Sequence, residues 1–196
     1  MQAGTLHVVA TPIGNLGDVT TRLAKVLASA AFVLCEDTRH TRNLCTALGV
    51  APRLVRCDEH EEERRIPEVL EALAAGLDVA LVSDAGTPAI SDPGYRIVRA
   101  AQLAGHRCSP VPGPSALSAA LSVSGLPTAS FAFEGFLPRK RGARRKLLAA
   151  DAITERSERR ENGLLVDLRQ LAPQEGLALL TDDLAEVLER FGQAPG

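Results

Sequence analysis

Aromatic side chains are scarce in this sequence, whose 196 residues include five Phe, one Tyr and no Trp. The core must therefore be aliphatic, and aromatic platforms for stacking single-stranded bases are not expected. Net charge is also small, because 22 Lys and Arg oppose 24 Asp and Glu, while hydrophobic residues make up 45% of the chain. This combination excludes a disordered polyampholyte and a uniformly basic nucleic-acid coat, and it indicates a globular protein.

Cysteines with the spacing of a metal or redox motif are missing as well. No two of Cys35, Cys45, Cys57 and Cys108 form a C-x-x-C pair, so neither a zinc site nor a redox pair is expected. No apolar run approaches the roughly 18 residues that span a bilayer. The first four residues contain no basic leader. We therefore expect a cytoplasmic protein with reduced thiols, no metal and no membrane partner.

Short apolar segments alternate with helical patterns along residues 5–123. Five of these segments predict strands, at 5–10, 32–35, 53–57, 78–83 and 107–111. The helices predicted between them begin with one capped by Asp18, and later ones end at Gly49, Gly76 and Gly105; a small-residue helix is predicted over 114–123. This alternation predicts an α/β fold with a mostly parallel five-stranded sheet and helices on both faces.

Parallel strands place the loops that follow them at one edge of the sheet, where α/β proteins bind ligands. Loop 1 (residues 11–17, TPIGNLG) matches neither G-x-G-x-x-G nor a phosphate-binding Gly-Lys-Ser/Thr loop, which disfavours a dehydrogenase or an NTPase. A mere tight turn explains loop 1 equally well. Loop 3 (residues 83–94, SDAGTPAISDPG) is longer than an ordinary connector. Its Gly86 lets a ligand approach the main chain, and Asp84 and Asp92 offer charge to a cationic or hydroxyl-rich ligand.

Loop 2 (residues 35–41, CEDTRHT) places two acids, Glu36 and Asp37, before Arg39. Asp37 or Thr38 is a plausible helix cap, and this explains one of the acids. The group is equally suited to polarising a hydroxyl or holding a phosphate, so both interpretations stay open. Loop 4 (residues 112–116, PGPSA) offers small side chains and free backbone N–H groups, which suit a ribose or a carboxylate.

The pattern changes after residue 127. Residues 130–136 (SFAFEGF) predict a strand that opens a second domain, and residues 139–146 carry six basic residues and no acid. That basic run suits phosphate, although a solvated loop explains it equally well. Residues 58–63 (DEHEEE) look metal-like but are expected to be an acidic, solvated helix start. Residues 151–196 carry ten acids and five Arg, and show no convincing second α/β unit.

The segments VATPIGNLGD, CEDTRHT, SDAGTPAISDPG, PGPSALSAAL and FAFEGFLPRK occur in this order over about residues 5–150. Together they resemble the 16S ribosomal RNA 2′-O-ribose methyltransferases of the tetrapyrrole methylase superfamily. The resemblance implies a class III methyltransferase that uses S-adenosylmethionine, forms a homodimer and methylates a cytidine ribose in 16S rRNA of the small ribosomal subunit. It implies an N-terminal methyltransferase domain over 1–126 and a second α/β domain over 127–196. The family's Glu-Ser-Pro-His-Arg and Arg-Glu-Leu-Thr-Lys segments do not occur in 151–196, so we expect this second domain to be partial and atypical, truncated or rearranged after Ala150.

The resemblance also implies roles for individual positions. Glu36, Asp37 and Arg39 would face the RNA, with Glu36 or Asp37 accepting the proton. The methyl donor would be bound by Pro12, Ile13, Gly14, Asp84, Gly86, Thr87, Ile90, Ser115 and Ala116. The phosphate contacts would be Arg139, Lys140, Arg141, Arg144, Arg145 and Lys146. Small-molecule members of the superfamily often carry Asp where Thr87 stands, which favours the RNA-modifying branch.

Two other functions remain open from the sequence. One is a tetrapyrrole-type small-molecule methyltransferase, which the basic run and the CEDTR segment disfavour because a porphyrinoid site needs a more apolar lining. The other is an inactive fragment that retains only dimerisation or weak donor binding, which the atypical segment after Ala150 favours.

Overall fold

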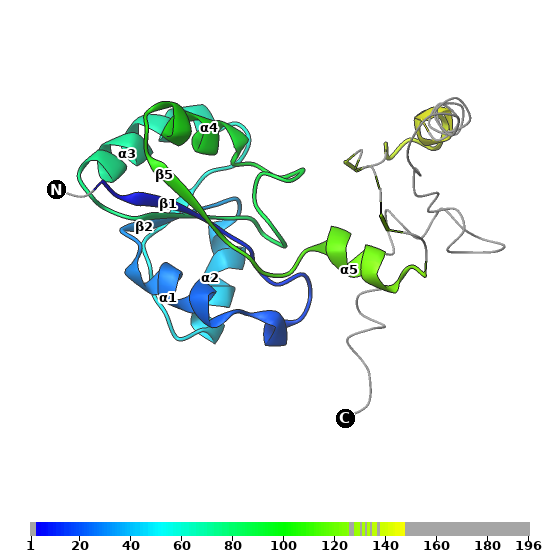
Figure 1. Cartoon of the computed structure of the whole chain (residues 1–196), viewed down its shortest axis with the longest axis horizontal. Helices are drawn as coiled ribbons and strands as arrows, with labels where there is room; N and C mark the ends of the chain where they lie inside the picture. The colour runs from blue at the N-terminus through cyan, green and yellow to red at the C-terminus, as the bar shows by residue number, and fades with distance from the viewer. Residues whose placement is uncertain are drawn as a thin grey trace. The chain divides into compact units, whose positions relative to one another are not determined.

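In the computed structural model, residues 5–123 form alternating strands and helices (Figure 1). The structure describes residues 3–125, 128–129, 131, 133, 135–136 and 138–147. The chain divides into two compact units, Met1–Ala116 and Leu117–Gly196. This division falls earlier in the chain than the predicted domain boundary after residue 126, which stays a prediction.

One parallel sheet organises the first unit. Its strands follow the order β3-β2-β4-β1-β5, and each pairing between them is parallel. The strands β2 and β4 are buried along their whole length, because helices cover both faces of the sheet. The predicted five-stranded α/β sheet is therefore confirmed. The strands are β1 (Thr5–Val9), β2 (Phe32–Cys35), β3 (Leu54–Arg56), β4 (Val79–Val82) and β5 (Arg107–Val111).

Four helices cover this sheet, two on each face (Figure 1). The helices α1 (Thr21–Ser29) and α2 (Thr38–Ala47) bury Leu23, Leu27 and Cys45 against one face. The helices α3 (Glu62–Ala74) and α4 (Tyr95–Leu103) bury Val69, Leu73, Ile97 and Ala101 against the other. The chain moves across the sheet in one direction from β1 to β3 and in the opposite direction from β3 to β5. Right-handed crossovers therefore place the first two helices and the next two on opposite faces.

The start of α1 differs from the prediction. Asp18 does not cap this helix; it belongs to a short 3-10 helix, η1 (Leu16–Asp18), which is capped by the side chain of Asn15. The cap of α1 is Thr20, whose hydroxyl oxygen accepts a hydrogen bond from the Leu23 amide at 3.1 Å. The predicted helix ends are confirmed, since Gly49, Gly76 and Gly105 all have the positive φ of a left-handed helix terminus.

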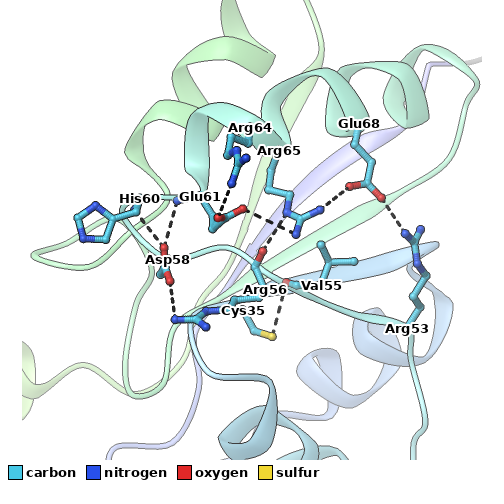
Figure 2. Close-up of polar contacts among 10 residues, drawn as sticks. All are labelled: Cys35, Arg53, Val55, Arg56, Asp58, His60, Glu61, Arg64, Arg65 and Glu68. Carbon is cyan, nitrogen blue, oxygen red and sulfur yellow. Dashed lines mark hydrogen bonds and ion pairs between the residues drawn. The ribbon is translucent and has the colours of Figure 1, made fainter.

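A set of charged side chains ties α3 to the edge strand β3 (Figure 2). The guanidinium of Arg65 donates to the Arg56 carbonyl at 3.0 Å and pairs with Glu68 at 3.3 Å. Glu68 also binds Arg53 at 2.8 Å, and Arg53 lies 5.3 Å from the centre of the Phe32 ring. These contacts occupy a carbonyl of the sheet's open edge and fix α3 against it.

The second unit is described in part. The helix α5 (Ala116–Val123) begins at the last residue of the first unit, and residues 141–147 are also helical. In the strand predicted at 130–136, Ser130, Ala132 and Glu134 lie outside the described residues, as does all of 151–196. None of the helices in the described ranges has both the length and the apolar character of a membrane span. All four cysteines are free, and Cys35, Cys45 and Cys57 are buried, as expected.

Candidate active site

Loops 1 and 3 are joined by their backbones at the carboxyl ends of β1 and β4. The Thr11 amide donates to the Gly86 carbonyl at 2.9 Å, and the Gly86 amide donates back to the Thr11 carbonyl at 3.2 Å. The buried hydroxyl of Thr11 donates to the Ser83 carbonyl at 3.1 Å. The two loops are therefore paired side by side, and Ile13 of loop 1 lies next to Gly86 of loop 3.

Loop 4 reaches the same place from β5. The Ala10 amide donates to the Val111 carbonyl at 3.1 Å, which pairs the chain just before loop 1 with the chain just before loop 4. A Cβ atom added to Gly113 would lie only 3.0 Å from the Cβ of Ala10. Loops 1, 3 and 4 thus meet at one edge of the sheet, and Ser115 and Ala116, both partly buried, follow directly from that meeting point.

Loop 3 has an unusual backbone. Ala89 (φ +67°) and Ser91 (φ +58°) are the two non-glycine residues with positive φ in the described part of the chain. Gly86 and Gly94, near the ends of the loop, also have positive φ, at +85° and +126°. Left-handed conformations at non-glycine residues persist only where the surroundings enforce them, and they gather at functional sites. The loop is closed by the Ala89 amide, which donates to the Pro93 carbonyl at 3.2 Å.

Loop 2 joins this surface through Asp84 of loop 3, whose carboxylate accepts a hydrogen bond from the Asp37 amide at 3.2 Å. The Asp37 carboxylate caps α2 by accepting from the Arg39 amide at 2.8 Å. It also binds the Arg39 guanidinium side-on, at 3.2 and 2.8 Å. These hydrogen bonds from Arg39 hold the pKa of Asp37 well below its usual range. Asp37 and Arg39 therefore pair with each other, and the capping interpretation of Asp37 is confirmed.

Glu36, the residue before this cap, has the opposite electrostatic environment. Burial raises the pKa of Glu36, and the neighbouring carboxylates of Asp84 and Asp92 raise it further. Burial also raises the pKa of Asp92, although a hydrogen bond from Ser83 opposes the shift. Crowded carboxylates favour the neutral acid because each one repels the charge of the others. Glu36 is thus the acid of loop 2 whose pKa is raised, whereas that of Asp37 is lowered.

The arrangement combines two features that suit different parts of a reaction. Loops 1, 3 and 4 present backbone and small side chains, against which a flat or extended ligand can lie closely. Glu36, Asp84 and Asp92 add negative potential beside them, which attracts a cation and can accept a proton. In the described ranges, no set of three His, Cys, Asp or Glu side chains is arranged to hold a metal ion.

Comparison with known proteins identifies the family. The model of the Tetrapyrrole (Corrin/Porphyrin) Methylases matches residues 5–191. The chain belongs to the tetrapyrrole methylase family. Among its curated relatives, Ribosomal RNA small subunit methyltransferase I of Xylella fastidiosa (strain Temecula1) is 46% identical over 95% of this chain and 70% of its own length. The protein of the same name from Pseudomonas aeruginosa is 45% identical over 100% of this chain and 71% of its own length.

A solved methylase is also similar to this chain. Uroporphyrin-III-C-methyltransferase from Thermus thermophilus aligns with 67% of this chain and 60% of its own, at 26% identity and a TM-score of 0.49. Membership of the methylase family rests on the sequence matches. The family match continues to residue 191, past residue 150, where the motif resemblance ends.

The structure of this methylase brings most of the predicted donor residues to one surface. Pro12, Ile13 and Gly14 belong to loop 1, and loop 3 supplies Asp84, Gly86, Thr87 and Ile90. Within loop 3 the side chain of Ile90 is half exposed, whereas Gly86 is buried against loop 1. Their assignment to the donor stays a prediction, as do the roles of Glu36, Asp37 and Arg39.

Glu62 on α3 also belongs to this region, although its place in the sequence does not predict a site residue. Residues 58–63 were expected to form a solvated helix start, but Glu62 is buried and accepts a hydrogen bond from the Gly94 amide at the end of loop 3. The spacing between Glu62 and the apolar residues of the helix is the sequence feature that indicates its burial. Glu62 lies four residues before Ile66 and seven before Val69, so it shares the apolar face of the helix.

A separate pocket of about 220 Å³ lies between α2 and the start of β3. Arg42, Cys45 and Leu54 contribute to its lining, together with residues 50–52. These last residues precede β3, whereas the loops of the candidate active site follow the strands. The pocket is therefore separate from the candidate active site, which lies at the carboxyl ends of the strands.

The predicted phosphate contacts belong to the second unit. Residues 141–147 are helical, and Arg139, Lys140, Arg141, Arg145 and Lys146 are exposed, whereas Arg144 is partly buried. The basic run is therefore a surface feature of that unit. Its contact with RNA stays a prediction.

Proposed function

We propose that this chain transfers a methyl group from S-adenosylmethionine to the ribose 2′-OH of a cytidine in 16S rRNA of the small ribosomal subunit. The main support for this proposal is the 46% identity to a relative named as a small-subunit rRNA methyltransferase, of which this chain spans 70%. The meeting of loops 1, 3 and 4 at the carboxyl edge supports the proposal, because a donor needs one continuous surface.

The residues of this surface fit the donor. Gly113 is exposed and has no side chain, so the donor's adenosine can lie against the backbone of loop 4 there. Thr87 brings no charge, and the negative potential that matches a sulfonium comes instead from Asp84, Asp92 and Glu36. Pro12, Ile13, Gly14, Ile90, Ser115 and Ala116 complete the proposed donor surface. When bound, S-adenosylmethionine supplies an electrophilic methyl carbon on sulfur.

The chain's own residues then have two tasks. Loops 1, 3 and 4 hold the methyl carbon in line with the attacking oxygen, and such alignment can lower a barrier by roughly 7–11 kcal/mol. Glu36 accepts the proton of the 2′-OH, which contributes on the order of 10²–10⁴-fold in rate. Asp37 is a weaker proton acceptor because the hydrogen bonds from Arg39 lower its pKa. We assign Asp37 and Arg39 to fixing the start of α2 beside Glu36.

The substrate and the assembly follow from the same proposal. The basic run Arg139–Lys146 binds phosphates of the RNA, because clustered guanidinium and ammonium groups release counterions from a nucleic acid. The enzyme acts in the cytoplasm, where ribosomal subunits are, and it works as a homodimer. Light scattering of the purified full chain tests the dimer, and a mass of one chain would contradict it.

The deciding experiment follows tritium from S-adenosylmethionine carrying a labelled methyl group. Small ribosomal subunits without this modification and a tetrapyrrole are offered separately to the purified chain. We expect label in 16S rRNA, at a ribose that resists alkaline cleavage of the following phosphodiester. Label in the tetrapyrrole alone would show that the substrate is a tetrapyrrole and not RNA. Absence of transfer to both, together with absence of calorimetric heat at millimolar donor, would show an inactive fragment.

A further inference from the structure

Glu62 is a buried carboxylate that lies outside the four loops. Its side chain is 5% exposed, at the first position of α3. One carboxylate oxygen accepts the hydrogen bond of the Gly94 amide, and the other lies 3.9 Å from the Arg96 guanidinium. A buried carboxylate is tolerated only when hydrogen bonds and a counter-charge replace its water, and Gly94 and Arg96 supply both.

Both of these partners belong to the chain that leaves loop 3. Gly94 is the last residue of the loop and the N-cap of α4, and Arg96 lies in the first turn of that helix. Arg96 also reaches Glu63 at 3.7 Å and the Glu59 carbonyl at 3.4 Å. The start of α3 is therefore joined to the end of loop 3 and the start of α4 by hydrogen bonds and ion pairs, although the two segments are about 30 positions apart in the chain.

Gly94 is held from its other side as well. A Cβ atom added there would lie 2.7 Å from a methyl carbon of Leu81, a buried residue of β4. Loop 3 is thus anchored at one end by the reciprocal hydrogen bonds of Gly86 and Thr11, and at the other by Glu62. Between these anchors lie Ala89 and Ser91, whose left-handed conformations need enforcement by their surroundings.

We propose that Glu62 is a positioning residue for the donor surface: it holds the exit of loop 3 so that residues 86–90 keep the conformation that receives the methyl donor. The inference rests on the proposed function, because it assigns the donor to this loop. Glu62 acts through the Gly94 amide and does not touch the donor. Without the carboxylate, a buried N–H loses its acceptor, and the left-handed residues lose one of their two anchors.

The test compares Glu62→Ala and Glu62→Gln with a matched control, Glu63→Ala. Glu63 is the next residue of α3 and also pairs with Arg96, but its side chain is 74% exposed and its ion pair is with α4. Glu62→Gln keeps an oxygen that can accept from Gly94. We expect Glu62→Ala to raise the KM for S-adenosylmethionine roughly tenfold, with a much smaller change in kcat. Glu62→Gln restores most of this loss, and Glu63→Ala equals the unmodified chain.

A second readout needs no activity. Amide hydrogen exchange of the chain without ligand reports the opening of residues 86–94 directly. We expect the Gly94 amide and its neighbours in loop 3 to exchange at least about tenfold faster in Glu62→Ala, whereas the amides of β1 and β4 keep their protection. If Glu62→Ala fails to fold, Glu62→Gln takes its place in the comparison. We then expect the amides of loop 3 to exchange faster in Glu62→Gln than in Glu63→Ala.

The outcomes separate this inference from the proposed function. Unchanged exchange in loop 3 of both Glu62 variants overturns the inference, whatever the substrate is. Lower thermal stability with an unchanged donor KM also overturns it, because the carboxylate would then serve the fold alone. Failure of the unmodified chain to transfer methyl groups overturns the proposed function, and the exchange measurement still decides whether Glu62 holds the loop.

Discussion

Thr11 and Gly86 exchange two backbone hydrogen bonds, at 2.9 and 3.2 Å, although 75 residues separate them. These bonds lie beyond the last residues of β1 and β4, so the ladder between the two parallel strands continues into their loops as an antiparallel bridge. The bridge turns the chain of loop 1 across the carboxyl edge. This single contact joins the two loops that we propose to hold the methyl donor.

The first prediction concerns Gly86, whose φ of +85° is strained for any residue with a Cβ atom. A Cβ atom there would lie 3.5 Å from an Ile13 methyl carbon, so space is available and strain is the main cost. We expect Gly86→Ala to lose about 1–2 kcal/mol of unfolding free energy and to weaken donor binding. Gly49→Ala is the control, because Gly49 has φ +68° and open space but lies at the end of α2. Equal donor affinity in the two variants would contradict the role of Gly86.

The second prediction separates the two acids of loop 2 by their activity. Glu36→Gln should lower kcat by on the order of 10²–10⁴-fold, because the base is lost. Asp37→Asn should leave turnover close to that of the unmodified chain, since Asn still caps α2. In the unmodified chain, the rate falls as pH drops through the pKa of Glu36, which burial and neighbouring carboxylates raise. A pH profile of kcat/KM checks this, and a profile that is unchanged in Glu36→Gln would exclude Glu36 as the base.

The same two variants should change stability in opposite directions. The pKa of Glu36 is raised in the folded state, so its charged form destabilises the fold. Glu36→Gln should therefore raise the unfolding free energy at neutral pH, and this gain should vanish as pH falls below the unfolded pKa. The pKa of Asp37 is lowered by Arg39, so its stabilising contribution is present above the unfolded pKa and lost as pH falls through the folded value. Urea unfolding over a pH series measures both, and shifts of the same sign would contradict the assignment.

Local sequence signals were enough for the sheet and for most loop positions. The strands β2 and β4 read as continuous apolar runs because both of their faces are buried. Glycines with positive φ mark the helix ends in the sequence as they do in the structure. The cap of α1 was predicted wrongly because Asp18 and Thr20 are both good capping residues, and the turn at Asn15 decides between them.

The details of the site depend on tertiary contacts that leave little trace in local sequence. Glu62 stands in an acidic run, and its burial follows only from the packing of α3 beside Gly94. Glu36 and Asp37 are chemically similar neighbours, and what distinguishes them is the set of groups around each carboxylate. One is paired with Arg39, whereas the other is crowded by Asp84 and Asp92 from another loop. Such differences arise only when separate strands bring their loops together.

A further prediction tests the buried hydroxyl of Thr11, which donates to the Ser83 carbonyl at 3.1 Å. Thr11→Val keeps the shape of the side chain but removes the donor, so we expect a loss of about 1–2 kcal/mol in unfolding free energy. Thr46→Val is the control, because the Thr46 hydroxyl bonds to the Arg42 carbonyl at an exposed site of α2. Its effect should stay within about 0.5 kcal/mol. Equal losses from the two substitutions in urea unfolding would refute a special role for the Thr11 hydroxyl.

The basic run of the second unit gives the last prediction, which concerns RNA binding. Each phosphate contact to single-stranded RNA contributes about −0.7 to the slope of log K against log salt concentration. Changing Arg139, Lys140, Arg141, Arg144, Arg145 and Lys146 to Gln should therefore make that slope shallower by up to about four. Arg53→Gln is the control, because the Arg53 side chain is 63% exposed but already paired with Glu68 at 2.8 Å. Filter binding to 16S rRNA between low and physiological salt measures the slopes. A slope that stays the same in the six-residue variant would remove the basic run from the RNA interface, while leaving the donor surface of the first unit unaffected.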